Sequence, residues 1–435
     1  MNKNLLIAAI AAMGVVSASA QTTVYLTGAT AFRSVVNKSL FDDYGAKLAA
    51  TTGSSSTDDA AAALLFTNIN VGGTTVDLSV KWSGSEAGIR TVASPSSNTV
   101  TDTFYSPSLV KALTGSFPKT AYALSSANQT NARGDIAFSD TWQAVSNFQG
   151  KAKDNRTYAT LNEAKVGVVP FTFVANKGCG IDNISLSTAC QLAKAGRVPA
   201  SIVTGITNDI TGGAWFTGRD PFSGTRVTAL MVGKVGYNTA IKNYKPTVSG
   251  GLITALGDYA SNAVSGLAVT AAGNGETSGG TLCGYMTNSM SATVSGVPVT
   301  VNGRGNTNIL ISYAGVADAA AKFSGGLIPL KFEGVHGRFG LTNEYSAANP
   351  GRLDSGYTNI ISGKYPFWSY EHILWDSSRM SAAASNTLTY LTNTFASYAT
   401  TNTLMAPNIA LGDMKVYRLS DAGEIKYSTN AALYR

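Results

Sequence analysis

The stretch TVYLTGATAFRSVVNKSLFDDY, residues 23–44, decides the fold class of this chain. It opens with a short β-prone run, Thr23 to Leu26, that stops at the turn sequence Thr27-Gly28-Ala29-Thr30. Apolar residues then recur at helical spacing, at Phe32, Val35, Val36, Leu40 and Tyr44. The stretch therefore predicts a strand, a glycine turn and an amphipathic helix in succession.

The same pattern returns further along the chain. Residues 76–82 alternate like a strand and run into 83–89, where another helix can begin, and residues 135–140 form a third short apolar strand. Residues 166–174 form a long β-rich run, interrupted by Pro170, that is predicted to carry the chain out of this first region. Repeated strand, turn and helix units indicate an α/β fold, in which ligands bind outside the carboxyl ends of the strands.

The first twenty residues are typical of a secretory signal peptide. Lys3 precedes an apolar run from Leu5 to Val16, and small residues at 18 and 20 suit cleavage before Gln21. No later stretch reaches about 18 uninterrupted apolar residues, and no cysteine stands at the cleavage site. We therefore expect a soluble protein in the periplasm or outside the cell. About 415 of the 435 residues remain after cleavage, enough for two domains.

Charge and metal-binding residue types narrow the function. The net charge of +7 comes with only 13% charged residues and no basic runs, which argues against a nucleic-acid binder. A mild positive field favours capture of small anions, and the alternative is simply a soluble secreted surface. Three cysteines and two histidines show no metal-ligand spacing. Cys179 and Cys190 can form a local disulfide or remain free thiols.

The segment from Thr217 to Arg226 predicts an anion site. Arg219 precedes Ser223-Gly224-Thr225, and a helix-compatible run follows from Arg226 to Val232. Unpaired amides at a helix N-terminus, with two hydroxyls and a guanidinium beside them, are suited to an oxyanion. The alternative is an ordinary helix cap with Arg219 in a salt bridge to Asp220.

Four blocks in this order carry a resemblance: residues 28–32, 84–89 and 137–140, and Arg219 with Ser223-Gly224-Thr225. Together they resemble the periplasmic phosphate-binding protein (PstS-like) of the bacterial phosphate ABC transporter, a type 2 periplasmic binding protein. The resemblance extends over most of the chain after residue 20. Two departures stand out. Glu86 occupies a position that is usually small or uncharged, and Pro221-Phe222 replaces a glycine-containing linker.

The resemblance implies a set of phosphate-binding residues. They are the Thr30 hydroxyl and the Ala31 amide, Ser85, Asp140, Arg219, Ser223, Gly224 and Thr225. It implies no catalytic residue, no metal and no cofactor. The expected partner is an inner-membrane ABC permease, and the protein is expected to be a monomer that binds no nucleic acid.

Asp140 supplies the argument for phosphate over sulfate. At neutral pH phosphate keeps a proton to donate, whereas sulfate has none, so a buried carboxylate rewards phosphate and repels sulfate. The alternative for Asp140 is a turn or helix cap, and for Thr30 and Ser85 an ordinary N-cap.

The resemblance further implies a two-lobed architecture with a ligand cleft between the lobes and a two-segment hinge. Lobe 1 is predicted at 21–165 and 310–435, and lobe 2 at 166–309. Two other functions stay open at this point. One is the same fold with a different oxyanion or a decayed site, acting as a surface interaction protein. The other is a secreted hydrolase using Ser85 or Ser223, for which two distant histidines offer no obvious base.

Overall fold

The computed structural model describes residues 22–112, 117–152, 154–237, 239–264, 267–269, 273–295, 301–302, 305–306, 308–337, 357–398, 407–421 and 423–427. The predicted signal peptide, residues 1–20, lies outside these residues. Within them, no helix has the length and hydropathy needed to cross a membrane. All three cysteines are free, so Cys179 and Cys190 are not bridged.

A large mixed sheet organises the molecule, in the order β12-β13-β21-β10-β23-β7-β1-β4-β3-β2. We call one side of it the first half. It contains β1 (Thr22–Gly28), β2 (Leu48–Thr51), β3 (Ala63–Val71), β4 (Thr74–Lys81), β7 (Ile136–Ser139) and β23 (Trp368–Trp375). Strand β1 pairs in parallel with both β4 and β7, and β23 pairs antiparallel with β7. Because β1, β4 and β7 run in the same direction, their carboxyl ends lie at the same edge of the sheet.

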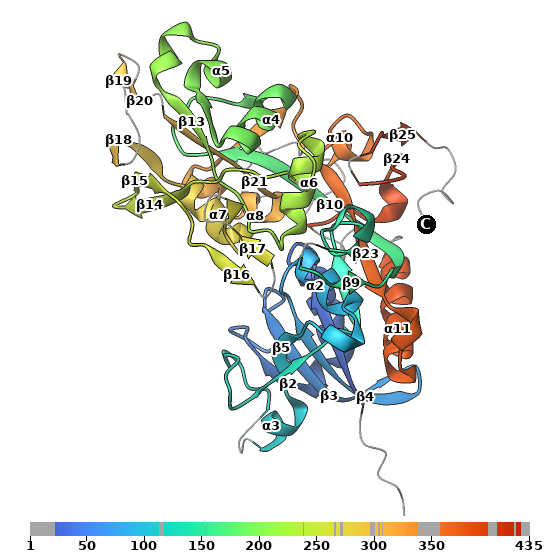
Figure 1. Ribbon diagram of the computed structural model, residues 1–435. Helices are drawn as coiled ribbons and strands as arrows, with labels where there is room; N and C mark the ends of the chain where they lie inside the picture. The colour runs from blue at the N-terminus through green and yellow to red at the C-terminus, as the bar shows by residue number, and fades with distance from the viewer. Residues whose placement is uncertain are drawn as a thin grey trace, which may run out of the picture.

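The second half of the sheet joins the first through one long strand, β10 (Asn162–Ala175). The other strands of this half are β11 (Asn183–Ile184), β12 (Arg197–Pro199), β13 (Gly213–Phe216), β21 (Ile309–Gly315) and β22 (Ile328–Phe332). Residues 162–170 of β10 pair with β23, and from Phe171 onward β10 pairs with β21. The two halves are therefore continuous through the backbone of β10 (Figure 1). The predicted lobe boundaries stay a prediction.

Pro170 does not interrupt β10, contrary to the sequence prediction. It is paired with Trp368 at the last position of the ladder with β23, just before Phe171 begins the ladder with β21. Proline cannot donate to a ladder. At the point where a strand exchanges one partner for another, the missing N–H does not break the strand.

Helices cover both faces of the sheet. Those associated with the first half are α1 (Arg33–Tyr44), α2 (Ser85–Ala93), α3 (Pro107–Ala112) and α11 (Ala382–Tyr398). Those of the second half are α4 (Leu186–Ala195), α5 (Ala200–Thr204), α6 (Gly224–Val232), α7 (Gly279–Met286) and α8 (Val316–Ala320), and α10 (Thr358–Ile361) precedes β23. The predicted α/β class is confirmed, as are the strand, turn and helix units that begin at β1 and β4.

Strand β7 shows how the two faces are packed. Phe138 lies between Phe32 and Phe395, with ring centroids 6.1 and 5.8 Å away, on the face covered by α1 and α11. Its neighbour Ala137 packs on the opposite face, in a cluster with Ile89 of α2. Successive residues of a strand point to opposite faces. The first three residues of the strand are therefore apolar, because apolar side chains of helices cover both of its sides.

The remaining described strands form five two-stranded sheets and one three-stranded sheet. They are β5 (Asp102–Tyr105) with β6 (Gln129–Ala132), β8 (Gly150–Lys151) with β9 (Thr157–Tyr158), β14 (Lys245–Ser249) and β18 (Ser289–Ser295) on either side of β15 (Leu252–Gly257), β16 (Asn262–Val264) with β17 (Leu267–Val269), β19 (Val301–Asn302) with β20 (Gly305–Asn306), and β24 (Val416–Tyr417) with β25 (Lys426–Tyr427).

The turn after β1 yields a stability prediction. Gly28 has φ +121°, and an added Cβ would overlap the carbonyl oxygen of Phe138 on β7. We expect Gly28→Ala to lower the free energy of unfolding by about 3 kcal/mol in urea denaturation, because both the backbone and the neighbouring strand must shift. The control is Gly73→Ala, where φ is +83° but the space is open, so only about 1 kcal/mol is expected. Equal losses in the two variants would contradict the packing argument.

Candidate functional site

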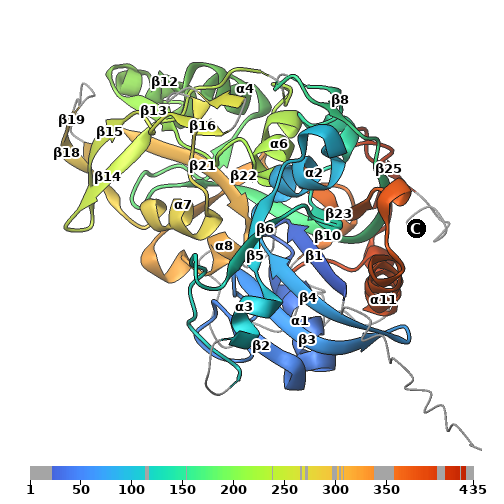
Figure 2. The same cartoon turned by 60° about the horizontal axis from the view of Figure 1, so that its bottom comes forward.

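The candidate site forms where the N-termini of α2 and α6 meet across the two halves of the sheet (Figure 2). Helix α6 begins at Gly224, two residues earlier than the sequence predicts, because the Ser223 hydroxyl accepts a hydrogen bond from the Arg226 N–H at 3.3 Å and caps the first turn. Helix α2 begins at Ser85, directly after Gly84, whose φ of +104° reverses the chain at the end of β4. Both helices direct their N-terminal turns, where the N–H groups lack intrahelical partners, toward the junction.

Asp140 lies at this junction. It follows β7, is 2% exposed, and its Oδ1 accepts a hydrogen bond from the hydroxyl of Ser85. Its Oδ2 accepts from the Thr225 hydroxyl at 3.5 Å. Burial raises the pKa of Asp140, while the Ser85 hydrogen bond and the field of Arg219 oppose the rise. Strand β7 thus presents a buried carboxylate to the first turn of α6.

Gly224 lies against the same carboxylate. An added Cβ at this position would overlap Asp140 Oδ1 and approach Ser85 Oγ to 2.6 Å. The structure therefore brings together Ser85, Asp140, Gly224 and Thr225, which the sequence places in three separate blocks. Glycine permits this because no side chain separates the α6 backbone from the opposite half.

Arg219 is buried beside this cluster and held in place by backbone carbonyls. Its Nε donates to the Glu276 carbonyl at 3.0 Å and its Nη2 to the Thr277 carbonyl at 3.0 Å, while its own N–H donates to the Tyr313 hydroxyl at 3.1 Å. Asp220 does not form the alternative salt bridge within the described residues. Its Oδ1 instead accepts from the Phe222 N–H at 2.7 Å and closes the turn. The guanidinium is thus oriented in advance of any ligand.

Thr30 and Ala31 lie on another side of the junction. They line a cavity of about 100 Å³ together with Arg33 from the first half and Asp318 from the second. Among the described residues, no hydrogen bond joins Thr30 or Ala31 to Ser85, Asp140 or α6. The predicted ligands are thus divided into a tight cluster at Asp140 and a small cavity beside Thr30.

Arg219 connects these two groups electrostatically. Its charge lowers the pKa of Asp140 on one side and of Asp318 on the other, although burial is the larger influence and raises both. An added Cβ at Gly279 would overlap Asp318 Oδ2 and lie 3.4 Å from Arg219 Nη1, so Asp318 and Arg219 face the same backbone position. Asp318 and Arg33 were not in the predicted set. The signal that could have found Asp318 is its place after strand β21, the same strand-end pattern as Thr30.

Glu86 directs its side chain to the loop that follows Asp140. Its Oε1 accepts from the Thr141 hydroxyl at 3.2 Å, and its Oε2 accepts from the Ser146 hydroxyl at 2.8 Å and the Asn147 N–H at 3.1 Å. Burial raises the pKa of Glu86 to about 7, against the effect of these three hydrogen bonds. The carboxylate has its own donors, so it does not compete with an anion for those of α6.

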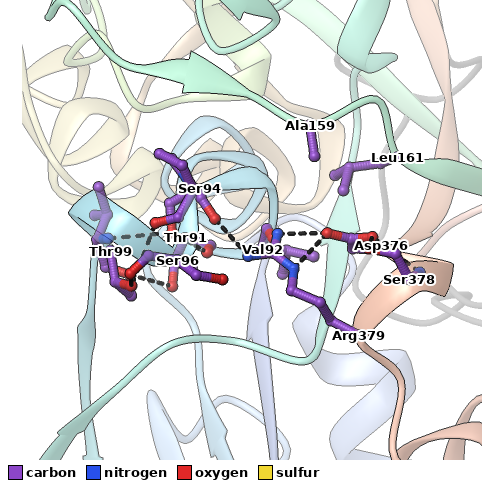
Figure 3. A network of polar contacts seen from close by, with 12 residues as sticks. Thr91, Val92, Ser94, Ser96, Thr99, Ala159, Leu161, Asp376, Ser378 and Arg379 are labelled. Carbon is purple, nitrogen blue, oxygen red and sulfur yellow. Dashed lines mark hydrogen bonds and ion pairs between the residues drawn. The ribbon is translucent and has the colours of Figure 1, made fainter.

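The far end of α2 is fixed by a second polar network, shown in Figure 3. Arg379 donates to the Ser94 carbonyl at 2.7 Å and to the Val92 carbonyl at 3.0 Å, and its guanidinium pairs with Asp376 after β23. A cation at a helix C-terminus satisfies orphan carbonyls and opposes the negative end of the dipole. This contact holds α2 in place, and with it Ser85 at the opposite end.

No protein-family model and no curated protein sequence matches this chain significantly. Solved structures that resemble it include an ABC-type phosphate transport receptor from Vibrio cholerae, with 13% identity, a TM-score of 0.38, and 89% of this chain and 99% of that one covered. PstS from Borrelia burgdorferi shows 11% identity and a TM-score of 0.34 over 90% of this chain and 99% of that one. A phosphate-binding protein from Stenotrophomonas maltophilia shows 14% identity and a TM-score of 0.33 over 86% and 83%.

Gly224 gives a direct test of the junction. Because a methyl group at this position overlaps Asp140 Oδ1, Gly224→Ala should keep the two halves from meeting as they do here. We expect anion affinity, measured by isothermal titration, to fall at least about tenfold, which corresponds to about 1.4 kcal/mol. Gly233→Ala, at the other end of α6 and with its nearest neighbour 3.1 Å away, is the matched control. An unchanged binding constant in Gly224→Ala would show that α6 does not pack on Asp140.

Glu86 predicts a pH dependence of stability. Its pKa rises from 4.5 to about 7 on folding, so the folded state holds the proton more tightly and stability decreases as pH rises through that window. Glu86→Gln cannot ionise and should lack this decrease. Between pH 4 and pH 8 we expect wild type to lose on the order of 2–3 kcal/mol more than the variant, from about 1.4 kcal/mol per pKa unit. Parallel pH profiles of the free energy of unfolding would contradict the buried position.

Proposed function

We propose that this chain is an exported solute-binding protein that captures inorganic phosphate for an ABC-type importer. The observation that carries the proposal is the buried carboxylate of Asp140, set against the first turn of α6 and within the field of Arg219. A helix N-terminus and a fixed guanidinium attract an oxyanion. A carboxylate at the same place repels an anion unless that anion carries a proton that it can donate to the carboxylate.

Protonation separates phosphate from sulfate at such a site. A hydrogen bond from protonated phosphate to Asp140 contributes favourably, since hydrogen bonds to charged groups are worth about 1.5–3 kcal/mol. Sulfate offers no proton, so its charge faces the carboxylate directly. A site built this way therefore selects phosphate by rejecting its nearest competitor as much as by attracting its ligand.

The proposed ligands come from both halves of the sheet. Thr30, Ala31, Ser85 and Asp140 belong to the first half, and Arg219, Ser223, Gly224 and Thr225 to the second. We propose that the two halves act as lobes and that phosphate binds between the Asp140 cluster and the cavity beside Thr30, next to Arg219. Binding draws on groups of both lobes at once, so it favours their approach. No covalent step is required.

Two other parts of the proposal rest on the sequence. Residues 1–20 have the pattern of a signal peptide, which makes the protein exported, and the permease in the inner membrane is the partner that the resemblance implies. Glu86 supports retention of the anion site, because its carboxylate is bonded to residues 141–147. A carboxylate directed at the anion would have favoured the alternative of a decayed site.

Titration of the phosphate-stripped protein, residues 21–435, tests the proposal. We expect phosphate to bind more tightly than sulfate, Arg219→Ala to lose at least about tenfold in phosphate affinity, and Asp140→Asn to reduce the preference for phosphate over sulfate. Arg197→Ala, which removes a cation stacked on Trp215 at 4.9 Å, serves as the control for net charge. Tight sulfate binding without phosphate heat, or unchanged constants in both site variants, would refute the proposal.

A further inference from the structure

Phe222 is the aromatic residue in the segment from Thr217 to Arg226. It lies in the turn between Arg219 and Ser223, so the chain places it in the second half. Its partly buried ring nevertheless packs on an apolar cluster of the first half. That cluster includes Ile89, Val92 and Ala93 of α2, Ala137 of β7, Leu374 of β23, and Phe148. The side chain therefore crosses from one half to the other.

The contact has a defined geometry. The rings of Phe222 and Phe148 are stacked, with centroids 6.2 Å apart and planes at 2°. Phe148 is itself 1% exposed, and the Arg90 guanidinium lies 5.4 Å from the centroid of its ring. Arg90 is paired with Asp154 at 3.2 Å. Phe222 thus packs on the ring of Phe148, which other residues of the first half already hold in place.

A backbone hydrogen bond accompanies the stacked rings. The Glu86 N–H, in the first turn of α2, donates to the Phe222 carbonyl at 3.1 Å. The first four N–H groups of a helix have no intrahelical partner, and here the opposite half satisfies one of them. Gly84 gives room for this approach, since a Cβ there would lie 2.7 Å from the Phe222 carbonyl oxygen.

The loop after Asp140 supports the partner ring. Glu86 Oε2 accepts from the Ser146 hydroxyl at 2.8 Å, and that hydroxyl oxygen accepts from the Phe148 N–H at 3.0 Å. The same residue that donates to the Phe222 carbonyl thus also sets the position of Phe148. Glu86 thus contributes to both the backbone hydrogen bond and the support of the stacked ring.

We propose that Phe222 is an interlobe anchor whose packing on Phe148 and α2 sets the lifetime of the bound anion. The statement rests on the proposed function, since a bound anion is assumed. Phe222 acts through closure and is a positioning residue, because its contacts are with protein atoms. It lies two residues before Gly224, so separating its ring from Phe148 also withdraws the first turn of α6 from Asp140.

Kinetics distinguish this role from a general structural one. An anion enters while the ring is away from Phe148, and loss of the ring makes this open state more populated, so the association rate is not lowered. Escape requires the ring to leave its cluster, so the dissociation rate depends on it directly. We expect Phe222→Ala to raise the phosphate dissociation rate at least about tenfold and not to lower the association rate, as measured by stopped flow. Phe222→Leu keeps part of the apolar contact, so its dissociation rate should lie between those of wild type and Phe222→Ala.

Small-angle scattering of the phosphate-free protein provides a readout that needs no ligand. Phe222→Ala should have a larger radius of gyration than wild type, because the contact between the halves is weakened. The matched control is Phe323→Ala, a partly buried phenylalanine packed on a core cluster of the second half. It should change neither the radius of gyration nor the dissociation rate.

Each outcome is decisive for one of the two proposals. An unchanged radius of gyration together with an unchanged dissociation rate in Phe222→Ala overturns the anchor, as does an equal effect in Phe323→Ala. Phosphate binding without any change of the dissociation rate in Phe222→Ala also overturns it and leaves the proposed function intact. Absence of phosphate binding in wild type defeats the proposed function, while an expanded Phe222→Ala would still show that the ring joins the two halves.

Discussion

The continuity of β10 is the constraint on which the rest of the structure depends. Its first nine residues belong to the ladder with β23 and its last five to the ladder with β21, so one strand orients both halves of the sheet. The strand ends of the first half, at Gly28 and Ser139, and the α6 turn of the second half consequently face one another. This shared strand is what brings the turn before α2 and the turn before α6, which belong to different halves, to the same place.

The junction is therefore decided by a few groups at element ends. Asp140 brings a negative charge to the positive end of α6, where the dipole, the Thr225 hydroxyl and the field of Arg219 all favour an anion. Burial acts in the opposite direction and raises the pKa of the carboxylate. Burial dominates, so the site holds a carboxylate that accepts protons more readily than one in water. Such a group is well suited to a ligand that carries a proton.

Local signals were sufficient for several elements of the fold and for part of the site. The run from Thr23 to Tyr44 predicts β1 and α1 because apolar spacing and a glycine turn act within a few residues. The cluster of Ser85, Asp140 and Gly224 could be assembled only through the resemblance, because no local pattern brings β7 to α6. Thr30 and Asp318 line a cavity apart from the Asp140 cluster. Their positions depend on how β10 orients the two halves of the sheet, which no local sequence pattern encodes. The uninterrupted course of β10 through Pro170 depends likewise on which strands pair at that point.

The two departures from the pattern that the sequence resembles, at Glu86 and at Pro221-Phe222, form one connected feature of the structure. A carboxylate at the start of α2 would ordinarily oppose an anion bound nearby, and an aromatic residue in the linker would ordinarily need a new apolar surface. Here the Glu86 side chain bonds the loop that positions Phe148, and Phe148 in turn offers the surface on which Phe222 packs. The Glu86 N–H in addition donates a hydrogen bond directly to the Phe222 carbonyl. Each departure supplies what the other requires, so Glu86 and Phe222 should be substituted together when the contribution of either one to the junction is measured.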